Sequence, residues 1–176
     1  MSQVTYQIDP SHSSAQFSVR HMMISNVRGD FTKVSGTVTY DAANPAASKA
    51  EASIEVASIE TRDPQRDAHL KSADFFDAEK YPLIGFRGAA LSGNGESWKL
   101  KGDLTIHGVT REITLDVDGP TPETKDPWGN LRIGATATGK LSRKDFGLTW
   151  NAALEAGGVL VGDDIKLTIE VEAIRQ

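Results

Sequence analysis

Apolar and polar residues alternate along most of this chain with a period of two. The clearest stretch is ESWKLKGDLTIHG, in which the residues of one parity are Trp98, Leu100, Gly102, Leu104 and Ile106. The same alternation continues in REITLDVDG, NLRIGATATGKL and DIKLTIEVEAI. A period of two is typical of strands that turn one face to a dry core and the other to water. The pattern therefore predicts a protein built from strands.

Weaker strand candidates bring the expected total to eight or nine. They are VTYQI, SAQFSVRH, KVSGTVTY, KAEASIEVASI and PLIGFRG. Turn residues separate the strands, and Asn94-Gly95 favours a tight hairpin because both central positions of that turn need a positive φ. We expect further turns at His107-Gly108 and at Arg28-Gly29-Asp30. Neither an internal repeat nor a linker interrupts the pattern, so residues 1–176 are expected to form a single domain.

Small residues on the predicted inward face distinguish two all-β architectures. Antiparallel strands with one apolar face either stack as two sheets or close into a barrel. Small inward side chains leave room inside, which favours a closed antiparallel barrel with an internal cavity over a tightly packed sandwich. The inward positions concerned are Gly36, Ala50, Ala52, Gly102, Ala135, Ala137 and Gly139.

The segment TRDPQRDAHLKSADFFDAEKYPLIGF (61–86) breaks the alternation. Asp63 is a good helix N-cap and Pro64 suits the first helical position. A second helical turn is expected over ADFFDAEK, before Pro82. Such a helix is too short and polar to be stable alone, so it must dock through Phe75 and Phe76. We therefore predict a short α-helical insert near residues 63–80 that caps one end of the barrel.

Composition and charge exclude several functions. The chain has no cysteine, which rules out disulfides and thiolate chemistry. Its net charge of −5 argues against nucleic-acid binding. No stretch approaches the roughly 18 apolar residues of a transmembrane helix. The N-terminus, MSQVTYQIDPSHSS, lacks the features of a signal peptide, so we expect a cytoplasmic protein, or a periplasmic one if a leader has been removed.

Four blocks in order resemble the YceI-like family across nearly the whole chain. They are YQIDPSHSSAQFSVRH, IETRDPQRDAHLKSADFFDAEKYPLIGF, GDLTIHGVTREITL, and RKDFGLTW with VGDDIKLTIEV. The resemblance implies a lipocalin-like barrel closed by a helix. It also implies a long apolar pocket for an isoprenoid chain, such as a polyprenyl or ubiquinone-type tail, that the protein binds for transport, storage or sensing. Family members are often homodimers, and many are periplasmic.

Strand parity and the family blocks together suggest a binding site. The expected lining of the apolar tunnel is Phe17, Val19, Phe31, Phe75, Phe76, Phe86, Leu104, Ile106, Phe146 and Trp150. Any one of these side chains could instead simply pack in the core. The expected polar rim of the tunnel is His12, Arg62, Arg66, His69 and Arg143. No cofactor is expected apart from an isoprenoid ligand, and no metal, because the histidines lack compact ligand spacing.

Two other functions remain open. The first is an interaction or scaffold barrel with a packed core, for which Trp128 in the loop DGPTPETKDPWGN is the best support. The second is an enzyme that uses His12, His69 and a nearby aspartate as acid and base. No nucleophile motif such as G-x-S-x-G occurs, and we expect the protein not to be an enzyme.

Overall fold

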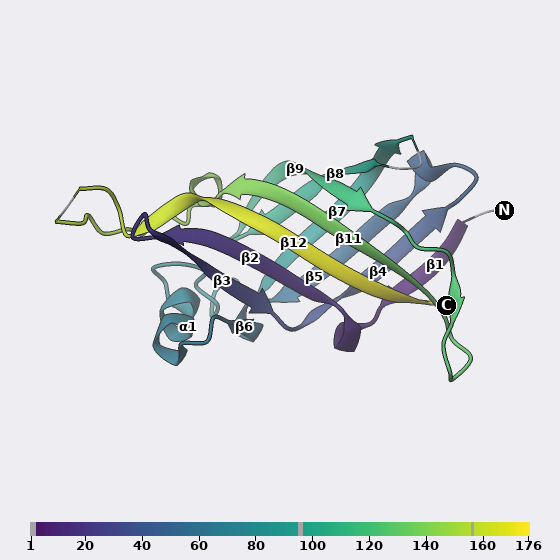
Figure 1. Cartoon of the computed structure of the whole chain (residues 1–176), viewed down its shortest axis with the longest axis horizontal. Helices are drawn as coiled ribbons and strands as arrows, with labels where there is room; N and C mark the ends of the chain where they lie inside the picture. Colours follow the sequence, from purple (N-terminus) through teal and green to yellow (C-terminus); the bar gives the residue numbers. More distant parts are fainter. Residues whose placement is uncertain (1–2, 95–96, 156) are drawn as a thin grey trace.

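The computed structural model describes residues 3–94, 97–155 and 157–176, which form a closed antiparallel barrel (Figure 1). The ring runs β1-β4-β5-β7-β8-β9-β11-β12 and closes because β12 pairs with both β11 and β1. The expectation of a barrel is confirmed, and the sandwich alternative is wrong. The strands of the ring are β1 Gln3–Ile8, β4 Val34–Asp41, β5 Lys49–Glu55, β7 Leu83–Gly93, β8 Trp98–Ile106, β9 Val109–Asp118, β11 Leu131–Ser142 and β12 Val161–Arg175.

Three further strands extend the wall from β12. The C-terminal end of β12 pairs with β1, whereas its earlier residues pair with β2 (Ser14–His21). Next come β3 (Ser25–Phe31) and the short β6 (Ile59–Glu60). The 3₁₀ turn η1 (Pro10–His12) separates β1 from β2, so together these two strands act as one interrupted partner of β12. On the other side of the sheet, β10 (Thr124–Lys125) pairs with β11.

The insert contains one α-helix, α1 (Pro64–Lys71), which lies under one end of the barrel beside β3 and β6 (Figure 1). As predicted, Asp63 caps it by accepting hydrogen bonds from the backbone of Gln65 and Arg66. The expected second helical turn is wrong, because residues 72–76 and 78–80 form bends and turns that fold back on the end of α1. The remaining short helices are the 3₁₀ turns η2 (Pro45–Ala47), η3 (Val56–Ser58) and η4 (Arg143–Phe146).

The predicted turns have three different outcomes. His107-Gly108 is a turn, and both residues have a positive φ. Arg28-Gly29-Asp30 is not a turn but the middle of β3, where a Cβ on Gly29 would collide with the ring of Phe17. The glycine there serves close packing between neighbouring strands. Gly95 lies outside the described residues, so the hairpin expected at Asn94-Gly95 stays a prediction.

A cluster of buried hydrophobic side chains fills part of the barrel interior. This core cluster contains Phe31, Val34, Val56, Ile59 and Phe146, all of them buried. α1 itself, with eight residues, is far too short to cross a bilayer, and no other described helix is longer. Two members of the core cluster, Phe31 and Val34, also border open space inside the barrel, and this space forms the candidate site.

Candidate ligand-binding site

Two apolar cavities lie inside the barrel. The first, here called the helix-side cavity, has a volume of about 120 Å³ and is bounded by Leu70, Phe75 and Phe76 of the insert. The second, the distal cavity, has a volume of about 170 Å³ and extends toward the opposite end. The surfaces that line both are almost entirely apolar. Four side chains line both cavities and so form a waist between them: Ile54, Leu104, Leu167 and Ile169.

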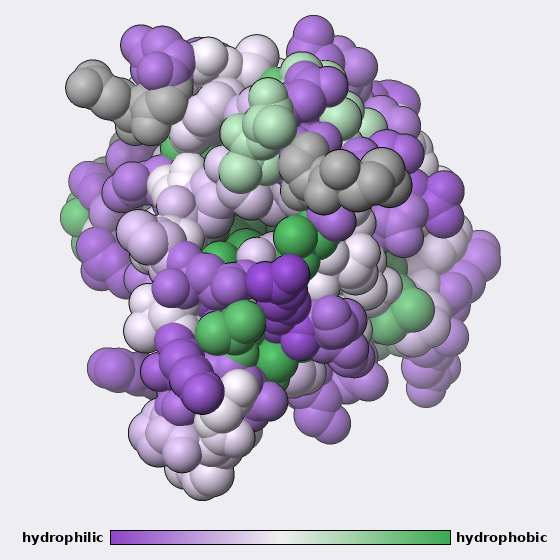
Figure 2. Space-filling model, turned by 90° about the vertical axis from the view of Figure 1, so that its right-hand side faces the viewer, coloured by the Kyte–Doolittle hydropathy of each residue, from purple (hydrophilic) through white to green (hydrophobic). Residues whose placement is uncertain are grey.

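The small inward residues create the distal cavity. Ala50 and Ala52 of β5 and Ala135 and Ala137 of β11 all line it, as the sequence suggested. Large side chains at these positions would fill the space between the two walls. Figure 2 looks at this end of the molecule and shows hydrophobic surface surrounded by hydrophilic surface. The barrel therefore encloses an apolar bore that the waist divides.

Eight of the ten predicted lining residues face the cavities. Phe86 lines the distal cavity, and Leu104 lines both. Six more line the helix-side cavity: Phe17, Val19, Phe31, Phe75, Phe76 and Ile106. Phe146 and Trp150 line neither: Phe146 is buried in the core, and Trp150 packs against Phe75 with 5.3 Å between ring centroids. Contact between any of these residues and a ligand stays a prediction.

Most of the aliphatic lining lies outside the set of predicted site residues. Three of the four waist residues, Ile54, Leu167 and Ile169, were not among the predicted site residues. Leu167 and Ile169 nevertheless share the inward parity of β12 that the alternation pattern identifies. The missing information was the register that brings β5, β8 and β12 to the same level inside the barrel.

The predicted polar rim does not form one group. Arg143 donates hydrogen bonds to the backbone at Val161 and at Trp150, and the ring of Trp150 contacts His69. His12 instead lies beside Glu172, near the other end of β12. Val161 and Glu172 are eleven residues apart on this strand, a span of roughly 36 Å at about 3.3 Å per residue. His12 and His69 are therefore not placed to act together.

Arg143 is buried, with 3% of its side chain exposed, and it lines the helix-side cavity. It donates to four backbone carbonyls, at Gly162, Leu148, Trp150 and Val161, over distances of 2.6 to 3.3 Å. Burial lowers the pKa of its guanidinium. Two of these carbonyls belong to the segment after β11 and two to the start of β12, so Arg143 holds these two segments together.

The charged side chains of the insert are also engaged with the protein. Arg66 donates to the hydroxyl and the carbonyl oxygen of Thr61, at 2.9 and 2.5 Å. His69 Nε2 lies 2.8 Å from the carboxylate of Asp74. Arg62 is exposed and has a positive φ of 68°. Of these three residues, only Arg62 has no side-chain partner among the described residues.

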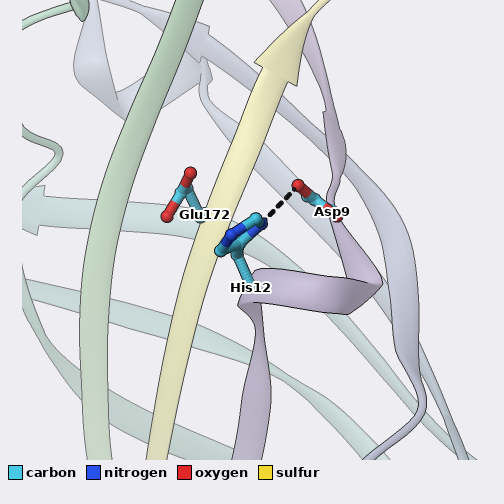
Figure 3. A group of neighbouring side chains, drawn as sticks. All are labelled: Asp9, His12 and Glu172. Carbon is cyan, nitrogen blue, oxygen red and sulfur yellow. Dashed lines mark hydrogen bonds and ion pairs between the residues drawn. The ribbon is translucent and has the colours of Figure 1, made fainter. Parts of the chain in front are cut away.

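Asp9, His12 and Glu172 could together offer three ligand atoms to a metal ion (Figure 3). Arg132 already contacts two of these side chains, because its Nη1 lies 2.8 Å from Asp9 and 3.0 Å from Glu172. Its hydrogen bond holds the pKa of Asp9 far below the usual range, and the pair raises the pKa of Arg132. The guanidinium thus supplies the positive charge that this acidic pair requires.

A closed antiparallel barrel around an apolar bore, with a helix across one end, defines the lipocalin-like class of fold. The family model of the YceI-like domain matches residues 6–173, and the chain belongs to the YceI-like family.

Individual relatives agree with this assignment. A protein of Staphylococcus aureus strain N315, UPF0312 protein SA2479, is 36% identical over 167 residues, which cover 95% of each chain. The structure of BcnA from Burkholderia cenocepacia superposes with a TM-score of 0.79 at 22% identity, covering 94% of this chain and 98% of that one. A polyisoprenoid binding domain from Saccharophagus degradans superposes with a TM-score of 0.71 at 15% identity, covering 98% and 99%. At these identities the two structures establish the fold alone.

Proposed function

We propose that this protein binds a long isoprenoid chain, of the polyprenyl or ubiquinone-tail type, lengthwise in the barrel. The observation that carries the proposal is the pair of apolar cavities that meet end to end at the waist. Membership of the YceI-like family supports it. The Saccharophagus polyisoprenoid binding domain, which has the same fold, supports the same class of ligand.

The hydrophobic effect can supply the binding energy. An isoprenoid tail has no charge, and each buried CH₂ group contributes about 0.8 kcal/mol. A few isoprene units therefore offset an association cost of roughly 4–15 kcal/mol. Discrimination by length is expected to be weak, since one methylene in an apolar pocket changes binding by only about 1–3 kcal/mol.

The ligand must pass through the waist. Each cavity alone is smaller than the roughly 300–1,000 Å³ that is usual for ligand pockets. A long chain therefore has to occupy both cavities, and the side chains that separate them must change rotamer to admit it. Leu104 is buried, and Leu167 and Ile169 are partly buried. All three side chains are aliphatic, so a change of rotamer breaks no hydrogen bond.

We propose transport, storage or sensing of this lipid, without a catalytic step. General acid–base chemistry needs two suitably placed titratable groups at the substrate. The described charged side chains in the cavity walls are Arg143 and Lys49, which line different cavities. We also propose that the protein works as a homodimer, with the exposed Trp128 as a contact.

The proposal can be tested with a matched pair of variants on β8. Leu104→Trp places a bulky ring in the waist, whereas Asp103→Trp places the same ring on the outer face of the same strand. We expect native mass spectrometry with added geranylgeraniol to show a complex for the wild type and for Asp103→Trp, and none for Leu104→Trp. Circular dichroism should show that both variants are folded. Absence of a complex with the wild-type protein would contradict the proposal.

A further inference from the structure

Three residues, Met22, Met23 and Ile24, connect β2 to β3, and the backbone of the first two is unfavourable for their side chains. Met22 and Met23 have φ values of 50° and 63°, and the backbone of Ile24 donates to that of His21 at 3.1 Å. β-turns with a positive φ at both central positions strongly favour asparagine, aspartate and glycine there, because these residues tolerate a positive φ. Large unbranched side chains at both positions cost backbone strain, which often persists where it serves a function.

The same residues are exposed to solvent. The side chains of Met23 and Ile24 are 58% and 74% exposed, and those of Met22 and Val159 are also exposed. A hydrogen bond of 2.8 Å from the backbone of Met22 to that of Leu160 joins the hairpin to the segment before β12. We call Met22, Met23, Ile24 and Val159 the apolar tip. Figure 1 shows both segments projecting at the end of the barrel that α1 covers.

The apolar tip adjoins the helix-side cavity. Val19, three residues before Met22, lines that cavity, and so does Val161, which pairs with His21. The tip is therefore connected through two short stretches of strand to the wall of the bore. A molecule that contacts the tip is close to one end of the cavity.

Basic side chains lie on the outer face of the strands that lead to the tip. Arg20 reaches the tip itself, where it donates to the carbonyl oxygen of Met23 at 3.3 Å. Arg28 of β3 and Lys166 of β12 flank Ser18 of β2 on the same outer face. They border a surface groove that also contains Arg62, Arg66, Asp30 and Glu60.

The groove carries more basic than acidic side chains, whereas the whole chain has a negative net charge. Among the described residues, Arg28, Lys166 and Arg62 form no ion pair, whereas Lys99 on the other side of the barrel pairs with Asp116. In a protein of net charge −5, unpaired basic side chains on the outer face of β3 and β12, the strands that lead to the apolar tip, point to a negatively charged, partly apolar surface.

We propose that the apolar tip inserts into the headgroup region of an anionic lipid bilayer while Arg20, Arg28 and Lys166 contact the headgroups. Apolar side chains beside basic ones bind such interfaces by burying their apolar area and by attracting anionic lipids. Each basic residue near the surface strengthens binding about fivefold, and salt screens this contribution. The biological role of the contact rests on the proposed function, since docking would bring the bore next to the membrane that holds its lipid.

Sedimentation with vesicles tests the docking alone. The vesicles contain phosphatidylcholine and phosphatidylglycerol but no isoprenoid. We expect the wild-type protein to bind them, and to bind less at high salt or to pure phosphatidylcholine. The double variant Met22→Asn with Met23→Gly should lose binding while its thermal midpoint is kept or raised, because these residues suit the turn. Ile24→Thr should weaken binding without changing the turn.

Two matched controls separate the tip from the rest of the surface. Leu83→Ser removes an apolar side chain that is 52% exposed on β7, and should leave vesicle binding unchanged. Arg28→Gln should weaken binding about fivefold, whereas Arg87→Gln, on the outer face of β7, should not.

Three results would overturn the proposal: no sedimentation of the wild type with anionic vesicles, unchanged binding of the Asn-Gly variant, or equal binding to neutral vesicles. A self-association that the Asn-Gly variant abolishes, without any vesicle binding, would make the tip a contact between copies and would also overturn it. The assay is independent of ligand binding. If the protein binds geranylgeraniol but not vesicles, only the membrane-docking proposal is contradicted. If it binds vesicles but not geranylgeraniol, only the proposed function is contradicted.

Discussion

Arg132 and Asp9 form an ion pair across β12, with 2.8 Å between Nη1 and Oδ2. Arg132 lies on β11 and Asp9 lies in the break between β1 and β2, so the pair joins the two strands that flank the end of β12. The same guanidinium bonds to Asp126 at 2.7 Å through Nε and to Glu172 at 3.0 Å through Nη1. Both partners of the pair are mostly shielded from water, with 16% and 12% of their side chains exposed.

Replacing Arg132 should destabilise the closure of the barrel. Arg132→Met keeps most of the side-chain volume but leaves Asp9 and Asp126 without their main donor. We expect a lower thermal midpoint by circular dichroism than for the wild type. Lys99→Met removes an exposed pair with Asp116 and serves as the control, with little expected change. Equal effects of the two substitutions would contradict the structural role of Arg132.

The same network predicts the response to acid. Hydrogen bonds from Arg132 lower the pKa of Asp126 to about 2 from a usual value near 3.8, and they lower that of Asp9 further. A carboxyl with a depressed pKa in the folded state stabilises the protein above its unfolded pKa and loses that contribution as the pH falls through its folded pKa. We therefore expect wild-type stability to fall between about pH 4 and pH 2. As the pH falls across this range, the thermal midpoint should fall less steeply for Arg132→Met than for the wild type. If the two proteins show the same dependence of thermal midpoint on pH, these carboxyl groups do not cause the loss of stability in acid.

Narrowing the distal cavity should change the preferred ligand length. Ala137→Leu adds apolar volume inside the distal cavity, whereas Thr138→Leu adds the same side chain on the outer face of β11. The inward variant should bind short prenyl alcohols as the wild type does and long ones more weakly, because only a long chain extends past the waist. Its folding stability should change by no more than about 1–3 kcal/mol. Competition binding with alcohols of graded length measures the difference, and a uniform loss at all lengths would argue against lengthwise binding.

The sequence predicted those features that depend on local pattern. Alternation identified the strands, and Asp63-Pro64 identified the start of α1, because parity and capping are properties of neighbouring residues. Features set by contacts between distant segments were missed. Gly29 has the sequence context of a turn residue, and only the position of Phe17 on the adjacent strand explains the glycine. Arg143 has the sequence context of an exposed rim residue, but it donates a hydrogen bond to the carbonyl oxygen of Val161, a residue far along the chain.

The insert should control how fast a ligand leaves the helix-side cavity. Phe75 lines that cavity and packs against His69 and Trp150, with ring centroids 5.1 and 5.3 Å away. Phe75→Leu keeps an apolar lining but removes the aromatic contacts that hold the insert in place. We expect faster dissociation of a fluorescent prenyl probe, measured by stopped flow. Phe146→Leu is the control, since Phe146 is buried and lines neither cavity. Faster release from the control alone would show that general destabilisation, not the insert, governs exchange.

Trp128 provides the test of the proposed homodimer. Its side chain is 80% exposed, and the carboxylate of Asp126 accepts hydrogen bonds from the backbone of Trp128 and Asn130, so the turn holds the indole outward. Truncation of a side chain this exposed should change the folding free energy by less than about 0.5 kcal/mol. If the indole instead packs against a second copy, Trp128→Ala should weaken association, because buried tryptophans are frequent hot spots of interfaces. Sedimentation velocity over a range of concentrations should then show a dimer for the wild type and a monomer for the variant. The same sedimentation coefficient for both proteins would remove Trp128 from any such interface.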